Sequence, residues 1–182
     1  MYVDFEVPKA KQLFLTQTTP ITCWAACAAG VKSAQKKSMV IETSILPEPY
    51  LTAFNNGQIL NPIGLFDLYS TLLKFKNRNF VTSDRDAVAT FIKANAPIIL
   101  SSAIVTFTNG APVHQGYHVR LIYGCIGETS SGNEDDFQVR IFDPSPPAGF
   151  ANYAGYFFTH FKYQVALKTG VHHTLVGQCW YA

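Results

Sequence analysis

The stretch "TQTTPITCWAACAAG", residues 16–30, places a cysteine between a Thr/Pro turn and a run of alanines. Pro20 favours a turn, and the residues from Cys23 onward are strong helix formers. Basic residues gather toward position 36, where positive charge complements the helix dipole. The stretch therefore predicts a helix over 23–36 that begins at the cysteine.

A cysteine at the start of a helix has two interpretations. Cys23 is either a small buried residue that opens a core helix or a nucleophile. The unpaired N–H groups and the partial positive charge of a helix N-terminus favour the thiolate form, which is the reactive one.

The rest of the first half predicts short helices and loops. Residues 1–16 read as an extended arm, and prolines and an Asn-Asn-Gly sequence break the segment 44–62. Asn61-Pro62 is typical of an N-cap followed by proline at the first helical position, which predicts a helix that continues to residue 77. Ser83 is the predicted N-cap of a helix over 84–95.

After Pro97 the pattern changes to apolar segments separated by loops that contain Gly, Ser and Pro. The predicted strands are 97–105, 117–125, 137–144, 155–167 and 172–181. We therefore expect one α+β domain, with a helical lobe over about 15–96, an antiparallel β lobe over about 97–182, and a cleft between them.

Composition limits the classes of function. The chain has 182 residues, of which 48% are hydrophobic and 14% charged, so it is able to fill a core. Its net charge is +2 and its basic residues are scattered, which argues against nucleic acid as the main partner. No apolar run approaches the ~18 residues of a membrane span, and residues 1–14 lack the pattern of a signal peptide.

The four cysteines form no CxxC pair, and the histidines do not alternate with them at the spacing of zinc ligands. We therefore expect no metal, no cofactor and mostly free thiols. Cys27 lies one helical turn beyond Cys23 and reads as structural, as do Cys125 and Cys179 in predicted strands.

If Cys23 is a nucleophile, it requires a base and a group that orients the base. His118 begins an apolar strand after a glycine-bearing loop, which favours it over His114 as the base. Asp143 ends the next strand, and a hairpin would bring it within reach of position 118. The side-chain amide of Gln17, with the backbone N–H of Cys23, would stabilise an oxyanion.

These residues resemble the papain-like cysteine peptidases. The motif of Gln, five residues and then Cys-Trp is matched by Gln17 and "CW" at 23–24, and "CWAA" is most similar to the small bacterial branch. That branch includes plant-pathogen effector proteases and relatives of the bacteriocin leader peptidases. "HVRLIYG" at 118–124 resembles its histidine strand, Asp143-Pro144 its third member, and "ANAPIIL" the segment before that strand.

The resemblance covers about residues 15–170 and implies a papain-like fold with catalytic residues Cys23, His118, Asp143 and Gln17. The implied activity is hydrolysis of peptide bonds in a protein substrate through a thioester. Two alternatives use the same triad: a glutamine deamidase or transglutaminase, and a peptidoglycan amidase. A non-enzymatic binding module is the alternative from another class.

The resemblance also implies an effector or toxin domain that a bacterium delivers or secretes and that acts in the cytoplasm of a target cell. We expect control by compartment, by a host factor or by a cognate inhibitor or immunity protein. Leader peptidases usually have Asp-Cys-Gly at the nucleophile, whereas this chain has Thr22-Cys23-Trp24, which argues against leader processing.

Overall fold

The computed structural model describes residues 1–19, 21–79, 84–108, 111–145, 151–159, 161 and 178–181. For residues 62, 77–79, 102–108, 111–117 and 178–181 it describes the backbone only. The helices are α1 (Ala10–Leu13), α2 (Cys23–Lys36), η1 (Glu42–Ser44), α3 (Tyr50–Asn55), α4 (Pro62–Leu72), α5 (Arg85–Asn95) and η2 (Glu134–Asp136). The strands are β1 (Tyr2–Glu6), β2 (Lys76–Asn79), β3 (Ile98–Thr108), β4 (Ala111–Glu128), β5 (Phe137–Phe142), β6 (Tyr153–Phe157) and β7 (Gln178–Tyr181).

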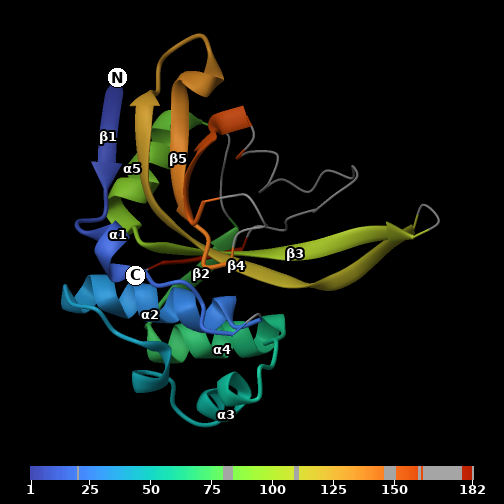
Figure 1. Cartoon of the computed structure of the whole chain (residues 1–182). Helices are drawn as coiled ribbons and strands as arrows, with labels where there is room; N and C mark the ends of the chain where they lie inside the picture. Colours follow the sequence, from blue (N-terminus) through green and yellow to red (C-terminus); the bar gives the residue numbers. More distant parts are fainter. Residues whose placement is uncertain are drawn as a thin grey trace.

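The strands form one antiparallel sheet in the order β2-β7-β3-β4-β5-β6 (Figure 1). The long strand β4 pairs with β3 along its first part, and β1 pairs with its last part. The protein is therefore α+β, as the sequence predicts.

Helices cover both faces of the sheet. One core contains α2, α4 and side chains of alternate strand residues, among them Ile99, Val119 and Leu121. The other core contains the apolar face of α5 and the intervening strand residues, such as Ile98 and Leu100. The alternation in β3 follows from the two-residue period of a strand. Figure 1 shows α2 and α4 below the sheet and α5 behind it.

The alanine-rich helix α2 lies close against β4. A Cβ atom added to Gly30 would stand 2.7 Å from Leu121 Cδ1, so a larger residue would push the helix away from the strand. Ala25, Cys27 and Ala28 of the same helix are fully buried. The missing side chain at Gly30 thus allows the short distance between α2, which begins with Cys23, and the sheet.

The predicted helix 23–36 is confirmed. The predicted cap at Asn61 is confirmed too, because its side chain accepts a hydrogen bond from the Gly64 N–H at 2.8 Å. That helix ends at Leu72 rather than at 77, since the backbone at Lys74 turns to φ 59° and β2 begins at Lys76.

The cap of α5 is Asp84, whose side chain accepts from the Asp86 N–H. The predicted cap, Ser83, lies outside the described residues. The strands predicted at 97–105, 117–125 and 137–144 correspond to β3, β4 and β5, although β3 and β4 extend further into a long hairpin. In the segment 155–167 the prediction is confirmed up to Phe157, where β6 ends, and is wrong at residues 158, 159 and 161, which are helical. In the segment 172–181 residues 178–181 form β7, and the other residues of both segments lie outside the described ones.

The expected division near residue 97 falls between α5 and β3, but elements before it also take part in the sheet. β1 and β2 both pair into it, and α5 packs against the face opposite α2. Within the described ranges, no helix combines the length and the apolar character needed to cross a membrane.

Candidate active site

Cys23 is the first residue of α2, and a hydrogen-bonded turn precedes it. Thr22 is the N-cap residue, and its hydroxyl donates to the Thr19 carbonyl at 3.1 Å and lies 2.8 Å from the Thr19 hydroxyl. The Thr22 carbonyl accepts the N–H groups of Ala25 and Ala26. The N–H groups of the first two helical residues are those for which a helix has no internal acceptor. They belong to Cys23 itself and to Trp24, the residue that follows it.

The next residue, Trp24, ties this end of the helix to α3 and α4. Its indole N–H donates to the Gln58 carbonyl at 3.1 Å, and its own carbonyl accepts from the Tyr69 hydroxyl at 3.0 Å. Its ring contacts that of Phe54 edge-on, with the centroids 6.4 Å apart. Trp24 is buried in the core on the α2 side of the sheet, where it holds the start of α2 in place.

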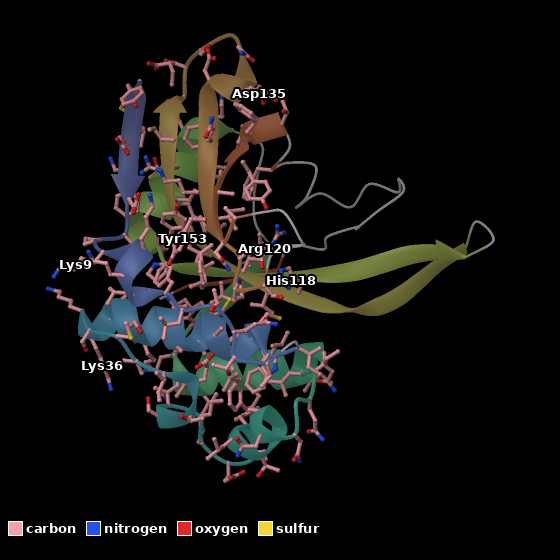
Figure 2. All side chains as sticks on the ribbon, viewed as in Figure 1. Lys9, Lys36, His118, Arg120, Asp135 and Tyr153 are labelled. Carbon is pink, nitrogen blue, oxygen red and sulfur yellow. The ribbon has the colours of Figure 1, made fainter. Side chains whose placement is uncertain are left out.

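His118 lies in β4, and Asp143 directly follows the neighbouring strand β5. Leu121 of β4 pairs with Phe142 of β5, so Asp143, directly after β5, lies beside the part of β4 that contains His118. Figure 2 shows His118 where β4 passes over α2. The expectation that strand pairing brings the two residues together is confirmed.

Cys23, His118 and Asp143 are in contact. His118 Nε2 lies 2.9 Å from both carboxylate oxygens of Asp143. A carboxylate only accepts, so Nε2 carries the proton and donates to it. His118 also forms a hydrogen bond with Cys23, for which its second ring nitrogen, Nδ1, remains. The imidazole therefore lies between a thiol and an orienting carboxylate.

The surroundings of His118 favour its charged form. Burial lowers its pKa, but the hydrogen bond to Asp143, the hydrogen bond to Cys23 and the charge of both partners outweigh burial and raise the pKa from 6.5 to about 9. For Asp143, burial raises the pKa, and His118 together with the Ser145 N–H more than reverses that effect, so the pKa falls below its usual value. At neutral pH the pair is an imidazolium and a carboxylate.

Asn152 and Ser145 hold Asp143 in position. The Ser145 N–H donates to Asp143 Oδ1 at 2.9 Å. The Asp143 N–H donates to the Asn152 carbonyl at 2.7 Å, and the Asn152 side chain donates back to the Asp143 carbonyl at 2.8 Å. Sequence reasoning missed Asn152, because an asparagine after a Pro/Gly-rich loop is an ordinary turn residue.

Gln17 is connected to the same site through its backbone. Its N–H donates to the Pro144 carbonyl at 3.1 Å, which ties the segment before α2 to the residue after Asp143. The side-chain Oε1 is buried and, within the described part of the chain, has no hydrogen-bond partner. The structure thus brings three of the four predicted residues into contact and places the fourth next to Pro144.

Arg120 is a buried cation near this group that sequence reasoning did not consider. It lies two residues after His118 in β4, with its guanidinium 5.9 Å from the centre of the Tyr156 ring. Its charge lowers the pKa of both Asp143 and Cys27, although other effects dominate for Cys27. The two-residue spacing from His118 was the only signal in the sequence.

The other thiols fit the structural role expected of them. Cys23, Cys27 and Cys125 are free, and Cys27 and Cys125 are fully buried. Burial raises the pKa of the Cys27 thiol well above its usual value and that of Cys125 to about 11. The side chain of Cys179 lies outside the described residues.

The remaining histidines are not described. The His114 side chain lies outside the described residues, and so do His160, His172 and His173. Across the part of the chain that is described, no three His, Cys, Asp or Glu residues come together in a way that would hold a metal ion.

No protein-family model matches the chain, and no curated protein has a matching sequence.

Proposed function

We propose that the protein is a cysteine peptidase of papain-like type, in which Cys23 is the nucleophile, His118 the base and Asp143 the residue that orients the base. One observation carries the proposal. Hydrogen bonds connect the His118 imidazole on one side to the Cys23 thiol at the start of α2 and on the other side to the buried carboxylate of Asp143. Three residues that merely packed together in the core would not need an imidazole that lies between a thiol and a carboxylate.

In the proposed reaction, His118 holds the proton of Cys23, and the thiolate attacks the carbonyl carbon of a peptide bond. The new C–S bond forms as the carbonyl π electrons move to oxygen. When the C–N bond breaks, His118 returns the proton to the departing amine, which leaves a thioester on Cys23. Water then adds to the thioester with His118 as base, releasing the acid and restoring the thiol.

The oxyanion of each step requires hydrogen-bond donors. The free N–H groups at the start of α2 supply one set, since Cys23 itself is the first helical residue. The Gln17 side-chain amide is the second proposed donor. The backbone bond from Gln17 to Pro144 supports this role, because it holds the segment against the part of the chain that positions Asp143.

The proposed substrate is a protein, and the proposed setting is that of an effector or toxin acting in a target cell under a cognate inhibitor. A deamidase or transglutaminase and a peptidoglycan amidase would use the same three residues. Mass spectrometry of the products separates them, because the peptidase leaves new backbone termini, deamidation adds about 1 Da to a glutamine, and the amidase releases muropeptides.

The test compares a proteome extract treated with wild type and with three variants. Cys23→Ala and His118→Ala should generate no new protein termini, while Cys27→Ala, which removes a buried thiol one turn along α2, should generate the wild-type set. If Cys23→Ala produces termini at the wild-type rate, the proposed function is wrong.

A further inference from the structure

Arg120 carries a buried positive charge beside the catalytic group. Only 5% of its surface is exposed, and its guanidinium lies 5.9 Å from the centre of the Tyr156 ring of β6. Figure 2 shows it next to His118 on β4. Burying a charge is costly unless other charges or hydrogen bonds compensate for the lost water. Packing alone therefore does not explain a guanidinium at this position.

The strand register, continued by one residue, places Arg120 directly opposite Asp143. Leu121 pairs with Phe142, so the next pair along the two antiparallel strands is Arg120 with Asp143. Asp143 also continues the pairing with the neighbouring strand on its other side, since its N–H donates to the Asn152 carbonyl at 2.7 Å. Side chains directly opposite one another share a face of the sheet, with their Cβ atoms about 4.5–5.5 Å apart. The positive charge of Arg120 thus lies on the same face as the Asp143 carboxylate and next to it.

Asp143 therefore has two positive neighbours on β4. His118 precedes Arg120 by two residues and lies on the same face of the strand, which makes it the diagonal neighbour of Asp143. Burial raises the pKa of the Asp143 carboxyl, whereas the hydrogen bond and charge of His118, the Ser145 N–H and the charge of Arg120 lower it. Among the described residues, the other titratable groups that face these side chains are Cys23 and Cys27 of α2 and Tyr156 of β6.

The two cations differ in how long they stay charged. In the proposed reaction His118 gives its proton to the departing amine, and its charge is lost at that step. A guanidinium stays charged at every pH that a protein tolerates. If the Asp143 carboxyl took up a proton, it would donate to Nε2, and the neutral imidazole would then carry its own proton on Nδ1. In that state Nδ1 is unable to accept a proton from the thiol or from water.

We propose that Arg120 is a positioning residue of the catalytic group, because its permanent charge, directly opposite Asp143, keeps the carboxylate ionised when His118 becomes neutral. The inference rests on the proposed peptidase function and goes beyond it by assigning a residue that acts through another one. An ionised Asp143 accepts from Nε2, which leaves the lone pair of Nδ1 for the proton of Cys23. Arg120 thus acts through Asp143 on the tautomer of His118.

The test compares Arg120→Met, which removes the charge but keeps a long side chain, with Arg120→Lys, which keeps the charge. Arg140→Met is the matched control, since Arg140 lies in the neighbouring strand β5 and is paired with Asp4 and Glu6 of β1. For each protein, kcat/KM is measured from about pH 4 to 8 on peptides of a proteome digest that wild type cleaves. The Asp143 carboxyl is titrated in parallel by ¹³C NMR, which does not depend on cleavage.

In Arg120→Met the Asp143 carboxyl should titrate at a higher pKa than in wild type. Its kcat/KM should fall about tenfold at neutral pH and further toward acid pH. Arg120→Lys should restore the wild-type titration, with kcat/KM within about threefold of wild type, and Arg140→Met should match wild type in both measurements.

Equal losses in Arg120→Met and Arg120→Lys, each with the pH profile of wild type, would overturn the proposal, since Arg120 would then only fill space. An unchanged titration of Asp143 in Arg120→Met would overturn it too. If Arg120→Met does not fold, Arg120→Gln takes its place, and a wild-type Asp143 carboxyl that titrates at the usual 3.8 would contradict the proposal without any variant. If wild type cleaves no peptide, the proposed function fails, and the carboxyl titration still decides whether Arg120 keeps Asp143 ionised.

Discussion

The charged state of His118 makes a quantitative prediction about stability and pH. The imidazolium is stabilised in the folded protein, where its pKa is about 9, relative to the usual 6.5. A group whose pKa is raised by folding contributes its full stabilisation below the unfolded pKa and loses it as the pH rises through the folded one. The free energy of unfolding should therefore fall between pH 6.5 and pH 9.

The size of the effect follows from the shift. A difference of 2.5 units between 9 and 6.5 corresponds to about 3 kcal/mol, at 1.36 kcal/mol per unit. His118 is mostly buried, with 24% of its side chain exposed, so solvent screens this contribution only in part. The buried thiols of Cys27 and Cys125 also lose stability as the pH approaches the usual thiol pKa of 9.0, so the effect of His118 is taken as the difference from a control variant that keeps both thiols.

The assay is urea denaturation at half-unit steps from pH 6 to 9.5, with His118→Gln as the control. Glutamine keeps a neutral N–H donor for Asp143 but does not titrate. Across the window, wild type should lose about 3 kcal/mol more than His118→Gln does. Parallel curves for the two proteins would refute the proposed imidazolium–carboxylate pair.

Three further changes test the site and its supports. Asp143→Asn removes the charge that stabilises the imidazolium, so the pKa of His118, followed by NMR, should fall and hydrolysis should slow by about 100-fold or more. A pKa that stays near 9 would contradict this. Gly124→Ala would place a Cβ atom 2.3 Å from the Phe5 carbonyl oxygen. It should lower the free energy of unfolding, measured by urea denaturation, by about 2–3 kcal/mol through the β1–β4 pairing. Gly132→Ala is the control and should be neutral, because its Cβ atom would meet nothing within 4 Å. Equal losses in the two variants would contradict the close approach of β1 to Gly124. Tyr69→Phe removes the hydrogen bond to the Trp24 carbonyl and should cost about 1 kcal/mol, and an unchanged urea midpoint would show that this bond does not hold α2.

The start of α2 was predictable because several local signals coincide there. A Thr/Pro turn, strong helix formers and lysines near position 36 all point to one helix, and it runs from Cys23 to Lys36. The pairing of His118 with Asp143 was also predictable, since two consecutive apolar strands with a short connection form a hairpin. Both features depend only on residues that are close in the sequence or on strands that follow one another along the chain.

Features that depend on distant contacts were not predictable. β2 reads as the continuation of α4, because nothing local shows that Lys74 takes a left-handed backbone and that β7, about a hundred residues later, pairs with Lys76–Asn79. The role of Asn152 was not predictable either, since it depends on the chain returning to Asp143 nine residues later.

The reactivity of Cys23 tests the central claim most directly. A cysteine without a cationic partner is only about 1% thiolate at pH 6.5, so it reacts slowly with iodoacetamide at that pH. If His118 holds the proton as an imidazolium, wild-type Cys23 should be modified up to about 100-fold faster at pH 6.5 than Cys23 in His118→Gln, as measured by peptide mass spectrometry. Equal rates in the two proteins would contradict the assignment of Cys23 and His118 as nucleophile and base.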